Sequence, residues 1–197
     1  MESDPIYQEA MERFGSLFET VQKTGLREPA AMTLATVDAT GQPSARIVLL
    51  RDVDERGFVF FTNSQSRKGD HLADNAHVGL CFHWDSLRVQ VCVEGTASPV
   101  SAAESDIYWQ RRPRGSQIGA WASLQSQPLS ARALLEQRVA EFEQQFADGE
   151  VPRPDHWHGY RIDPVRIEFW EEGPSRLHTR TVYKLRDEGW TRFCLYP

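Results

Sequence analysis

Short strand-like segments joined by tight turns fill much of the chain and restrict the folds that it can adopt. Residues 31–37 and 44–50 are two such segments, and the turn at 38–41 between them contains Asp and Gly. A connection this short joins antiparallel neighbours, because a parallel pair needs a crossover of a dozen or more residues. The same patterns predict further strands at residues 58–62, 78–84, 87–95, 159–162, 166–170, 180–185 and 190–196.

Helical patterns lie between these strands. The first predicted helix covers about residues 5–24, with Asp4 as its N-cap and Pro5 in its first turn. Further helices are predicted at residues 66–75, 101–112 and 130–149, with a loop or short helix at 116–123. About eight strands joined by short turns close into a barrel to remove their exposed edges. The predicted fold is therefore mainly β with helices, a β-barrel core with the helices packed outside it.

Composition and charge exclude several classes of protein. The 197 residues carry a net charge of −6, which argues against a surface for nucleic acid. No apolar run approaches the length of a membrane span, and the acidic N-terminus lacks the pattern of a secretory signal, so we expect a cytoplasmic protein without a membrane partner. Cys81, Cys92 and Cys194 lack metal-ligand spacing, and we expect reduced thiols and no bound metal.

The basic residues are clustered in spite of the negative net charge. Arg176, His178 and Arg180 are spaced two apart, so an extended backbone would place all three on one face. Residues 67–68 and 111–114 form two more basic clusters. Cationic groups placed side by side favour a small anionic ligand, such as a phosphorylated or carboxylated molecule. The alternative is a charged strand edge that only contacts solvent.

Four stretches combine such basic residues with aromatic and polar neighbours: residues 46–51, 61–68, 108–121, and 168–170 with 176–178. In this order and spacing they resemble the pyridoxamine 5′-phosphate oxidase family, and the resemblance runs from about residue 5 to the C-terminus. It implies an FMN-binding split β-barrel that works as a homodimer. It also implies one domain over residues 1–197, with the N-terminal helix at about 5–24 and the C-terminal strands at about 159–197.

The sequence Ser66-Arg67-Lys68 stands at a predicted helix N-terminus, where free N–H groups and the helix dipole favour an anion. Without the resemblance, Ser66 is as well explained as an ordinary N-cap beside solvated cations. The resemblance implies that Arg67 and Lys68 bind the FMN phosphate, together with Arg46, Gln125 and Ser126. The remaining residues that it assigns to the flavin are Ile47, Val48, Leu49, Leu50, Phe61, Thr62, Gln90, Trp170 and Arg180.

Tyr108 and Arg112 are four apart on a predicted helix and so share a face, and Ser116 follows soon after. A phenol, a guanidinium and a hydroxyl that converge would hold a phosphate, whereas a packed Tyr and a helix-end Arg are the structural alternative. In the resembled family this set binds the 5′-phosphate of the substrate. The resemblance adds Arg51 to the substrate site. It also implies that Arg176 and His178 cover the substrate ring and act in catalysis.

The implied reaction converts pyridoxamine or pyridoxine 5′-phosphate to pyridoxal 5′-phosphate, with O2 as acceptor and H2O2 as product. One alternative is an FMN oxidase of secondary metabolism of the phenazine-pathway type, and another is a non-catalytic flavin- or haem-binding split-barrel protein. The retained Tyr108, Arg112 and Ser116 argue against both. Arg51 and Thr179 stand where the family usually has Lys and Asp, so the preferred substrate stays open.

Overall fold

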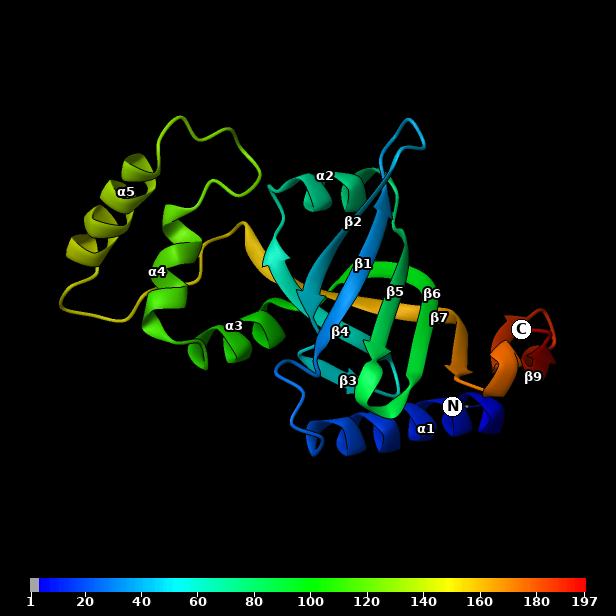
Figure 1. The fold of residues 1–197 in the computed structure, drawn as a ribbon. Coiled ribbons are helices and arrows are strands. Elements are labelled where there is room, and N and C mark those ends of the chain that lie inside the picture. The colour runs from blue at the N-terminus through cyan, green and yellow to red at the C-terminus, as the bar shows by residue number, and fades with distance from the viewer. Residues whose placement is uncertain (1–3) are drawn as a thin grey trace.

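The computed structural model describes residues 4–197, and residues 1–3, which the single-domain prediction includes, lie outside the described part. Within residues 4–197 it contains nine strands and five α-helices (Figure 1). The strands are β1 Ala31–Val37, β2 Pro43–Leu49, β3 Asp52–Asp54, β4 Gly57–Asn63, β5 His77–Trp84, β6 Val89–Pro99, β7 Trp157–Glu171, β8 Thr179–Arg186 and β9 Gly189–Leu195. The α-helices are α1 Pro5–Gln22, α2 Arg67–Asp74, α3 Ala102–Gln110, α4 Arg114–Ala122 and α5 Arg132–Gln145.

All strand pairs are antiparallel, and the main path of the sheet runs β2-β1-β5-β6-β7-β4-β3. The sheet curls into a partial barrel with the helices at its ends and sides (Figure 1). Strand β7 pairs with β4 through residues 157–162 and with β8 through residues 166–171. One strand thus joins the barrel to the C-terminal hairpin of β8 and β9. The prediction of a mainly β fold is confirmed.

The prediction of two strands around Pro164 is wrong, because β7 continues through this residue. Glu94 of β6 pairs with Arg166 and Gly95 pairs with Pro164, which leaves Val165 as an extra residue opposite β6. Such a bulge accommodates proline, since the ladder is already interrupted where the missing N–H would donate. Strand β3 was not predicted, because its three residues read as part of the turn before β4.

Helix α1 closes one end of the barrel. Phe14 is fully buried, and its ring lies 4.9 Å from the ring of Phe58 and 5.1 Å from that of Phe82. Asp4 caps the helix by accepting a hydrogen bond from the Ile6 N–H at 2.9 Å. Its other carboxylate oxygen accepts from the Trp190 N–H at 2.9 Å, so the start of α1 is tied to β9. The predicted N-cap at Asp4 is confirmed.

A smaller core holds α3, α4 and α5 beside the barrel. Trp109, Ile118, Val151 and Trp157 form its buried part. The stretch predicted as a loop or short helix is α4, and α5 packs Phe142 against Trp121 with ring centroids 5.6 Å apart. These helices form one end of the molecule, and β8 and β9 lie toward the other (Figure 1).

No helix within residues 4–197 has the length and apolar character needed to cross a membrane.

Candidate active site

A pocket of about 250 Å³ lies where β2, β4, α2 and α3 meet. Its ten lining residues are Ile47, Val48, Leu49, Arg51, Phe61, Thr62, Lys68, Tyr108, Arg112 and Gln125. The sequence analysis had singled out every one of them: nine lie in the stretches 46–51, 61–68 and 108–121, and the tenth is Gln125. A neighbouring pocket of about 300 Å³ shares Phe61, Thr62, Arg112 and Gln125 and adds Ser116. The fold thus brings the residues predicted for a flavin phosphate and those predicted for a substrate phosphate to one place.

A larger cavity of about 530 Å³ lies behind Arg112, among α3, α4 and the segment before β7. Three of its charged lining residues, Asp106, Arg114 and Arg153, have partners within the protein. Arg153 pairs with Asp106 at 2.6 Å, and Arg114 donates to the carbonyl oxygens of Gly149 and Phe146. We therefore place the candidate active site in the two smaller pockets, where cationic groups face open space.

Lys68 is the cation of this pocket that is withdrawn furthest from solvent. It is 8% exposed, and its Nζ donates to Ser66 Oγ at 2.6 Å and to Gln125 Oε1 at 2.9 Å. Burial, with a smaller effect from Arg46, lowers the pKa of Lys68 to about 8. Both of its hydrogen-bond partners are neutral, and an anion in the pocket would restore the balance of charge.

Ser66 occupies the N-cap position of α2 as predicted, but its side chain does not cap the helix. The Ser66 hydroxyl donates to the Asn63 carbonyl at 2.6 Å and accepts from Lys68. The first N–H groups of the helix are therefore left without this side-chain acceptor. Gly69 lets the preceding loop pack tightly here, since an added Cβ would lie 1.9 Å from the Ser64 carbonyl oxygen.

The guanidinium of Arg46 is held in place by neutral hydrogen-bond acceptors. Its guanidinium donates to the Leu34 carbonyl at 2.9 Å, to Thr36 Oγ1 at 2.8 Å and to Ser44 Oγ at 2.9 Å. Thr36 in turn lies 3.1 Å from Nδ1 of the buried His71. Burial, together with nearby Arg67, lowers the pKa of Arg46. Neither Thr36 nor His71 could be recognised from the sequence, because they are 35 positions apart and meet only where α2 packs against β1.

An aromatic wall borders the substrate side of the pocket. The Phe61 ring stacks on Tyr108 at 4.2 Å and on Trp157 at 5.3 Å. The guanidinium of Arg112 lies over Trp157, 4.7 Å from the ring centroid. Arg112 Nη2 donates to the Ser116 carbonyl at 3.0 Å, while its buried Nε has no partner within residues 4–197. An unpaired donor of this kind is suited to an anionic ligand.

The prediction that Tyr108 and Arg112 lie on the same helix is wrong, although both line the pocket. Helix α3 ends at Gln110, and Pro113 begins a new turn into α4. Proline cannot continue the helix, so Arg112 lies in the connection and reaches the pocket from there. Ser116 is close to Arg112 through its carbonyl oxygen and not through its hydroxyl.

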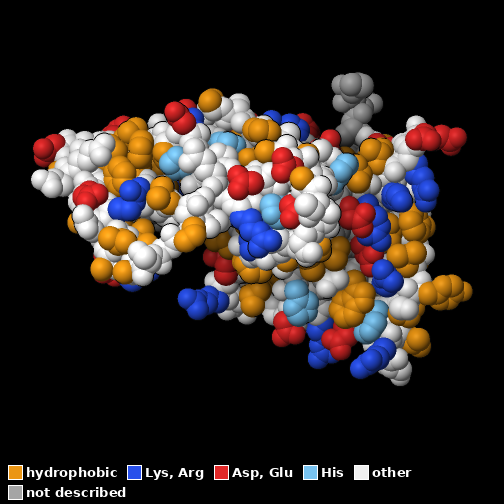
Figure 2. Space-filling view, turned by 90° about the horizontal axis from the view of Figure 1, so that it is seen from above, with side chains coloured by type: hydrophobic (Ala, Val, Ile, Leu, Met, Phe, Trp, Pro, Cys, Tyr) orange, Lys and Arg blue, Asp and Glu red, His pale blue; other side chains and the backbone are white. Residues whose placement is uncertain are grey.

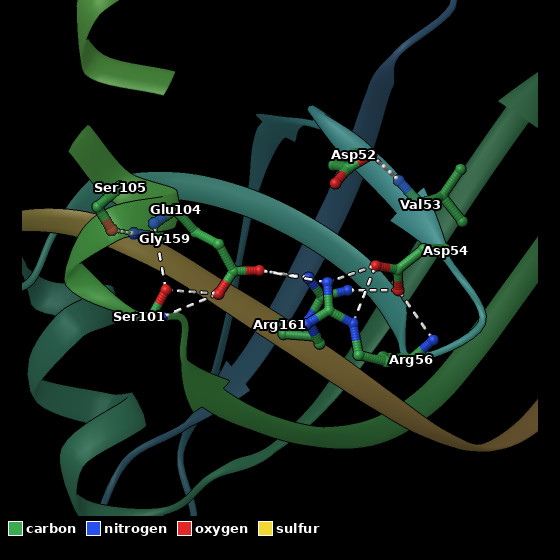
Figure 3. A network of polar contacts seen from close by, with 9 residues as sticks. All are labelled: Asp52, Val53, Asp54, Arg56, Ser101, Glu104, Ser105, Gly159 and Arg161. Atoms are coloured by element: carbon green, nitrogen blue, oxygen red, sulfur yellow. Dashed lines mark hydrogen bonds and ion pairs between the residues drawn. The ribbon is translucent and has the colours of Figure 1, made fainter. Parts of the chain in front are cut away.

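A network of ion pairs fixes the position of α3 against the barrel (Figure 3). Arg161 of β7 donates to Asp54 at 2.6 Å and to Glu104 at 3.0 Å. Glu104 is also part of the predicted capping box, in which Ser101 and Glu104 bond reciprocally. The hydrogen bonds from Ser101 and the nearby Arg161 lower the pKa of Glu104 to about 2. The helix that carries Tyr108 is thus tied to both β3 and β7.

A second cluster of predicted residues lies on β6, β7 and β8. Gln90, Trp170 and Arg180 are paired across these three strands. The Trp170 ring lies 4.4 Å from the ring of His178, whose Nδ1 accepts from the Gly173 N–H at 3.2 Å. Arg180 Nε donates to the buried Glu168 at 2.7 Å, a partner that the sequence did not reveal.

The extended backbone that would place Arg176, His178 and Arg180 on one face is absent from the structure. Pro174–Arg176 forms a 3-10 turn, and Ser175 and Arg176 have φ values of 55° and 63°. Strand β8 starts only at Thr179, so Arg176, His178 and Arg180 do not line one strand face. Arg176 is exposed, whereas His178 is half-buried against Trp170.

Within residues 4–197 of one chain, the residues of the two candidate pockets and those of the second cluster do not come together. Among the described residues, the linings of the two candidate pockets include none of Gln90, Trp170, Arg176, His178 and Arg180. Figure 1 shows why, since β8 and β9 lie at the end of the molecule away from α3 and α4. Seen from above, Lys, Arg and His side chains gather toward that same end, on the right of Figure 2.

Ser126, with φ of 75°, is exposed beside Gln125.

Family models match most of the chain. Residues 18–146 match the model described as pyridoxamine 5′-phosphate oxidase. Residues 157–197 match the model described as the pyridoxine 5′-phosphate oxidase C-terminal dimerisation region. The second match covers β7, β8 and β9, the strands that carry Trp170, His178 and Arg180.

Curated relatives and solved structures agree with these models. The chain is 54% identical over 194 residues to a pyridoxine/pyridoxamine 5′-phosphate oxidase of Myxococcus xanthus, covering 98% of this chain and 92% of the relative. It is 51% identical to the enzyme of that name from Alkalilimnicola ehrlichii, with 98% and 99% covered.

The structure of PhzG from Burkholderia lata, in complex with tetrahydrophenazine-1-carboxylic acid, is 30% identical with a TM-score of 0.91, over 98% of this chain and 97% of that one. A pyridoxamine 5′-phosphate oxidase-related, FMN binding protein from Nostoc punctiforme is 17% identical with a TM-score of 0.75, over 93% and 96%, and supports the split-barrel fold alone. With two matching family models and relatives above 50% identity over nearly the whole chain, the protein belongs to the pyridoxine/pyridoxamine 5′-phosphate oxidase family.

Proposed function

We propose that this chain is an FMN-dependent oxidase that converts pyridoxamine 5′-phosphate or pyridoxine 5′-phosphate to pyridoxal 5′-phosphate. The acceptor is O2 and the product is H2O2. The observation that carries the proposal is the pocket that Lys68 and Arg112 both line, where neither has an anionic partner among residues 4–197. Two separate cationic sites fit a cofactor phosphate and a substrate phosphate better than one ligand alone.

The residues present fit an FMN phosphate. Lys68 and Arg46 are supported by neutral hydrogen-bond partners, and the N-terminus of α2 leaves N–H groups available beside them. Arg67, exposed at the same helix start, adds a third positive charge. In this proposal Ile47 to Leu50, Phe61, Thr62, Gln125 and Ser126 surround the cofactor. When bound, FMN supplies the chemistry that takes a hydride from the substrate and passes electrons to O2.

The residues of the chain then bind and orient the substrate. Arg112, Tyr108 and Ser116 hold its phosphate, and Arg51 adds a positive charge at the rim. The Phe61–Tyr108–Trp157 stack keeps that side of the pocket apolar, which excludes water from the reacting face. Fixing the phosphate at one end limits the orientations of the ring and so raises the rate of the chemical step.

The second cluster completes the site from another copy of the chain. We propose that Gln90, Trp170 and Arg180 of one protomer contact the flavin held by its partner, with Arg176 and His178 over the substrate. The match of residues 157–197 to a dimerisation region supports this arrangement, as does the absence of these residues from the pocket linings within residues 4–197. We also propose that the whole chain acts as one flavin-binding domain.

A phenazine-type oxidase is the competing function, because PhzG shares the fold closely. The identity of 51–54% to relatives named pyridoxine/pyridoxamine 5′-phosphate oxidase, against 30% to PhzG, favours the vitamin B6 esters. The Arg112 Nε, which has no partner within residues 4–197, favours a phosphorylated substrate as well, because a phosphate oxygen could accept its hydrogen bond.

An oxygen-electrode assay on the FMN-loaded protein tests the proposal. We expect oxygen uptake with pyridoxamine 5′-phosphate and pyridoxine 5′-phosphate, and little with the same compounds lacking phosphate. Equal rates with the unphosphorylated compounds would contradict a substrate-phosphate site. A protein that binds FMN but consumes no oxygen with either ester would contradict the oxidase activity.

A further inference from the structure

Cys81 and Cys92 lie directly opposite each other on the neighbouring strands β5 and β6. The residues that flank them in sequence, Leu80, Phe82, Val91 and Val93, are buried in the barrel core. Side chains alternate along a strand, so both cysteines lie on the outer face of the sheet. Both are free thiols and half-buried.

The positions suit a disulfide. Directly opposed residues of an antiparallel pair have Cα atoms about 4.5–5.5 Å apart, within the 4.4–6.8 Å that disulfides span. Hydrogen bonding from the neighbouring Cys92 thiol lowers the pKa of Cys81. The hydrogen bonding with Cys81, and after it burial, raise the pKa of Cys92. Cys81 is thus favoured as the thiolate while Cys92 keeps its proton. Thiol oxidation needs such a thiolate as the attacking group, with a second thiol beside it to close the disulfide.

Cys92 is connected to the second cluster. The side-chain amide of Gln90 donates to the Cys92 sulfur at 3.3 Å. Gln90 is paired in the sheet with Trp170, whose ring lies against His178. A change at the Cys92 sulfur therefore alters the hydrogen bonding of a residue that we place at the flavin.

We propose that Cys81 and Cys92 form a redox-active pair that a hydroperoxide oxidises to a reversible disulfide. The Cys81 thiolate attacks one oxygen of H2O2, the O–O bond breaks, and the departing hydroxide takes up a proton to leave as water. The thiol of Cys92 then loses its proton and attacks the sulfur of the resulting sulfenic acid. The S–S bond forms, the S–O bond breaks and a second water leaves. Two electrons pass from the two thiols to the peroxide.

The source of the oxidant and its effect rest on the proposed function. The oxidase would release H2O2 beside Gln90, so the enzyme would be exposed to its own product. In the disulfide the Cys92 sulfur is drawn toward Cys81 and away from the Gln90 amide. Gln90 then loses its partner and shifts, which we expect to weaken flavin binding. Loss of one hydrogen bond of ordinary strength corresponds to about a two- to tenfold change in affinity.

The test treats the FMN-loaded protein with H2O2 in a Cys194→Ser background, which removes the exposed third thiol. Peptide mapping by mass spectrometry, with thiol titration, follows Cys81 and Cys92. We expect a Cys81–Cys92 cross-link that dithiothreitol reverses, and a two- to tenfold rise in the FMN dissociation constant by fluorescence. In the matched Cys81→Ser and Cys92→Ser variants, peroxide should leave that constant unchanged.

Two results would overturn the proposal. The first is that both thiols stay titratable, or that each is oxidised separately to sulfinic acid, under peroxide that fully modifies Cys194 in the unsubstituted chain. The second is a disulfide that forms with no change in the FMN dissociation constant. Failure of the proposed oxidase activity would appear separately, as absent oxygen uptake, because the cross-link is measured with added peroxide.

Discussion

At the scale of single residues, the site is defined by cations without counterions. Lys68 is buried, its two hydrogen-bond partners are neutral and Arg46 lies nearby, so its folded-state pKa of about 8 lies below the ordinary value of 10.5. The folded chain without ligand therefore holds fewer protons than the unfolded chain between about pH 8 and 10.5. Its free energy of unfolding rises with pH in this window through Lys68, because the unfolded state binds more protons there.

Flavin binding should have the opposite pH dependence. A phosphate beside Lys68 favours the charged amine, so binding takes up a proton above about pH 8. We expect the FMN dissociation constant to rise with pH above 8, by up to about tenfold per unit. Fluorescence titrations between pH 7 and 9.5 measure this. The Lys68→Arg variant should show little pH dependence, because guanidinium stays charged throughout. A flat profile in the unsubstituted protein would contradict the role of Lys68.

Arg112 tests the second cationic site. We expect Arg112→Ala to raise the KM for pyridoxamine 5′-phosphate by about ten- to a hundredfold, because charge-assisted hydrogen bonds to the phosphate are lost. The FMN dissociation constant should stay the same. Arg111→Ala is the matched control, because Arg111 is exposed next to Arg112 and does not line either pocket. An equal change in both constants for Arg112→Ala would show that the two anion sites are one.

The sequence predicted the residues that line the pocket better than those that support them. The ten lining residues were identified because they belong to motifs that can be matched along the chain. Thr36 and His71 were missed, and the role of Glu168 was not predicted although it lies in the stretch 168–170. These contacts join residues 10 to 35 positions apart and depend on burial. A single Thr, His or Glu in a strand or helix carries no local signal of such a partner.

At the scale of elements, most strands and helices were predicted to within two or three residues, since each has its own periodicity and turn signals. The errors have local causes. Pro164 indicated a break, but β7 continues through a bulge there. The spacing of Arg176, His178 and Arg180 would place them on one face of an extended backbone, but the backbone turns at Pro174–Arg176. Neither bulges nor positive φ values at non-glycine residues can be predicted from residue type alone.

Arg161 tests how α3 is held. Arg161→Met removes its ion pairs with Asp54 and Glu104 while keeping the length of the side chain. Both carboxylates keep other partners, Arg56 and Ser101, so we expect a loss of about 1–3 kcal/mol of unfolding free energy in urea. The KM for the substrate should rise with little change in kcat, because α3 carries Tyr108.

The control for Arg161→Met is Arg132→Met, which breaks the exposed pair of Arg132 with Glu136 on α5. That pair should contribute less than about 0.5 kcal/mol. Equal destabilisation in the two variants would mean that the network at Arg161 has no special role in stabilising the fold.

At the scale of the whole molecule, the two clusters suggest an active site shared between protomers. Mixing the Lys68→Met and Trp170→Ala variants, after unfolding and refolding together, tests this. Each mixed dimer would contain one site with both substitutions and one with neither. We expect about a quarter of the unsubstituted activity from a random mixture of two weakly active variants. Activity that stays at the level of the separate variants would place both clusters in one chain.

Strand β7 has a consequence for how the chain can be divided. The first family model ends at residue 146 and the second begins at residue 157, where β7 starts. Yet β7 supplies the hydrogen-bonded neighbour of both β4 and β6, so a fragment that stops at residue 156 would expose two unsatisfied strand edges. We therefore expect such a fragment to aggregate when produced alone and to recover native structure only with the missing C-terminal piece present. On this expectation, the two recognisable sequence modules fold only together.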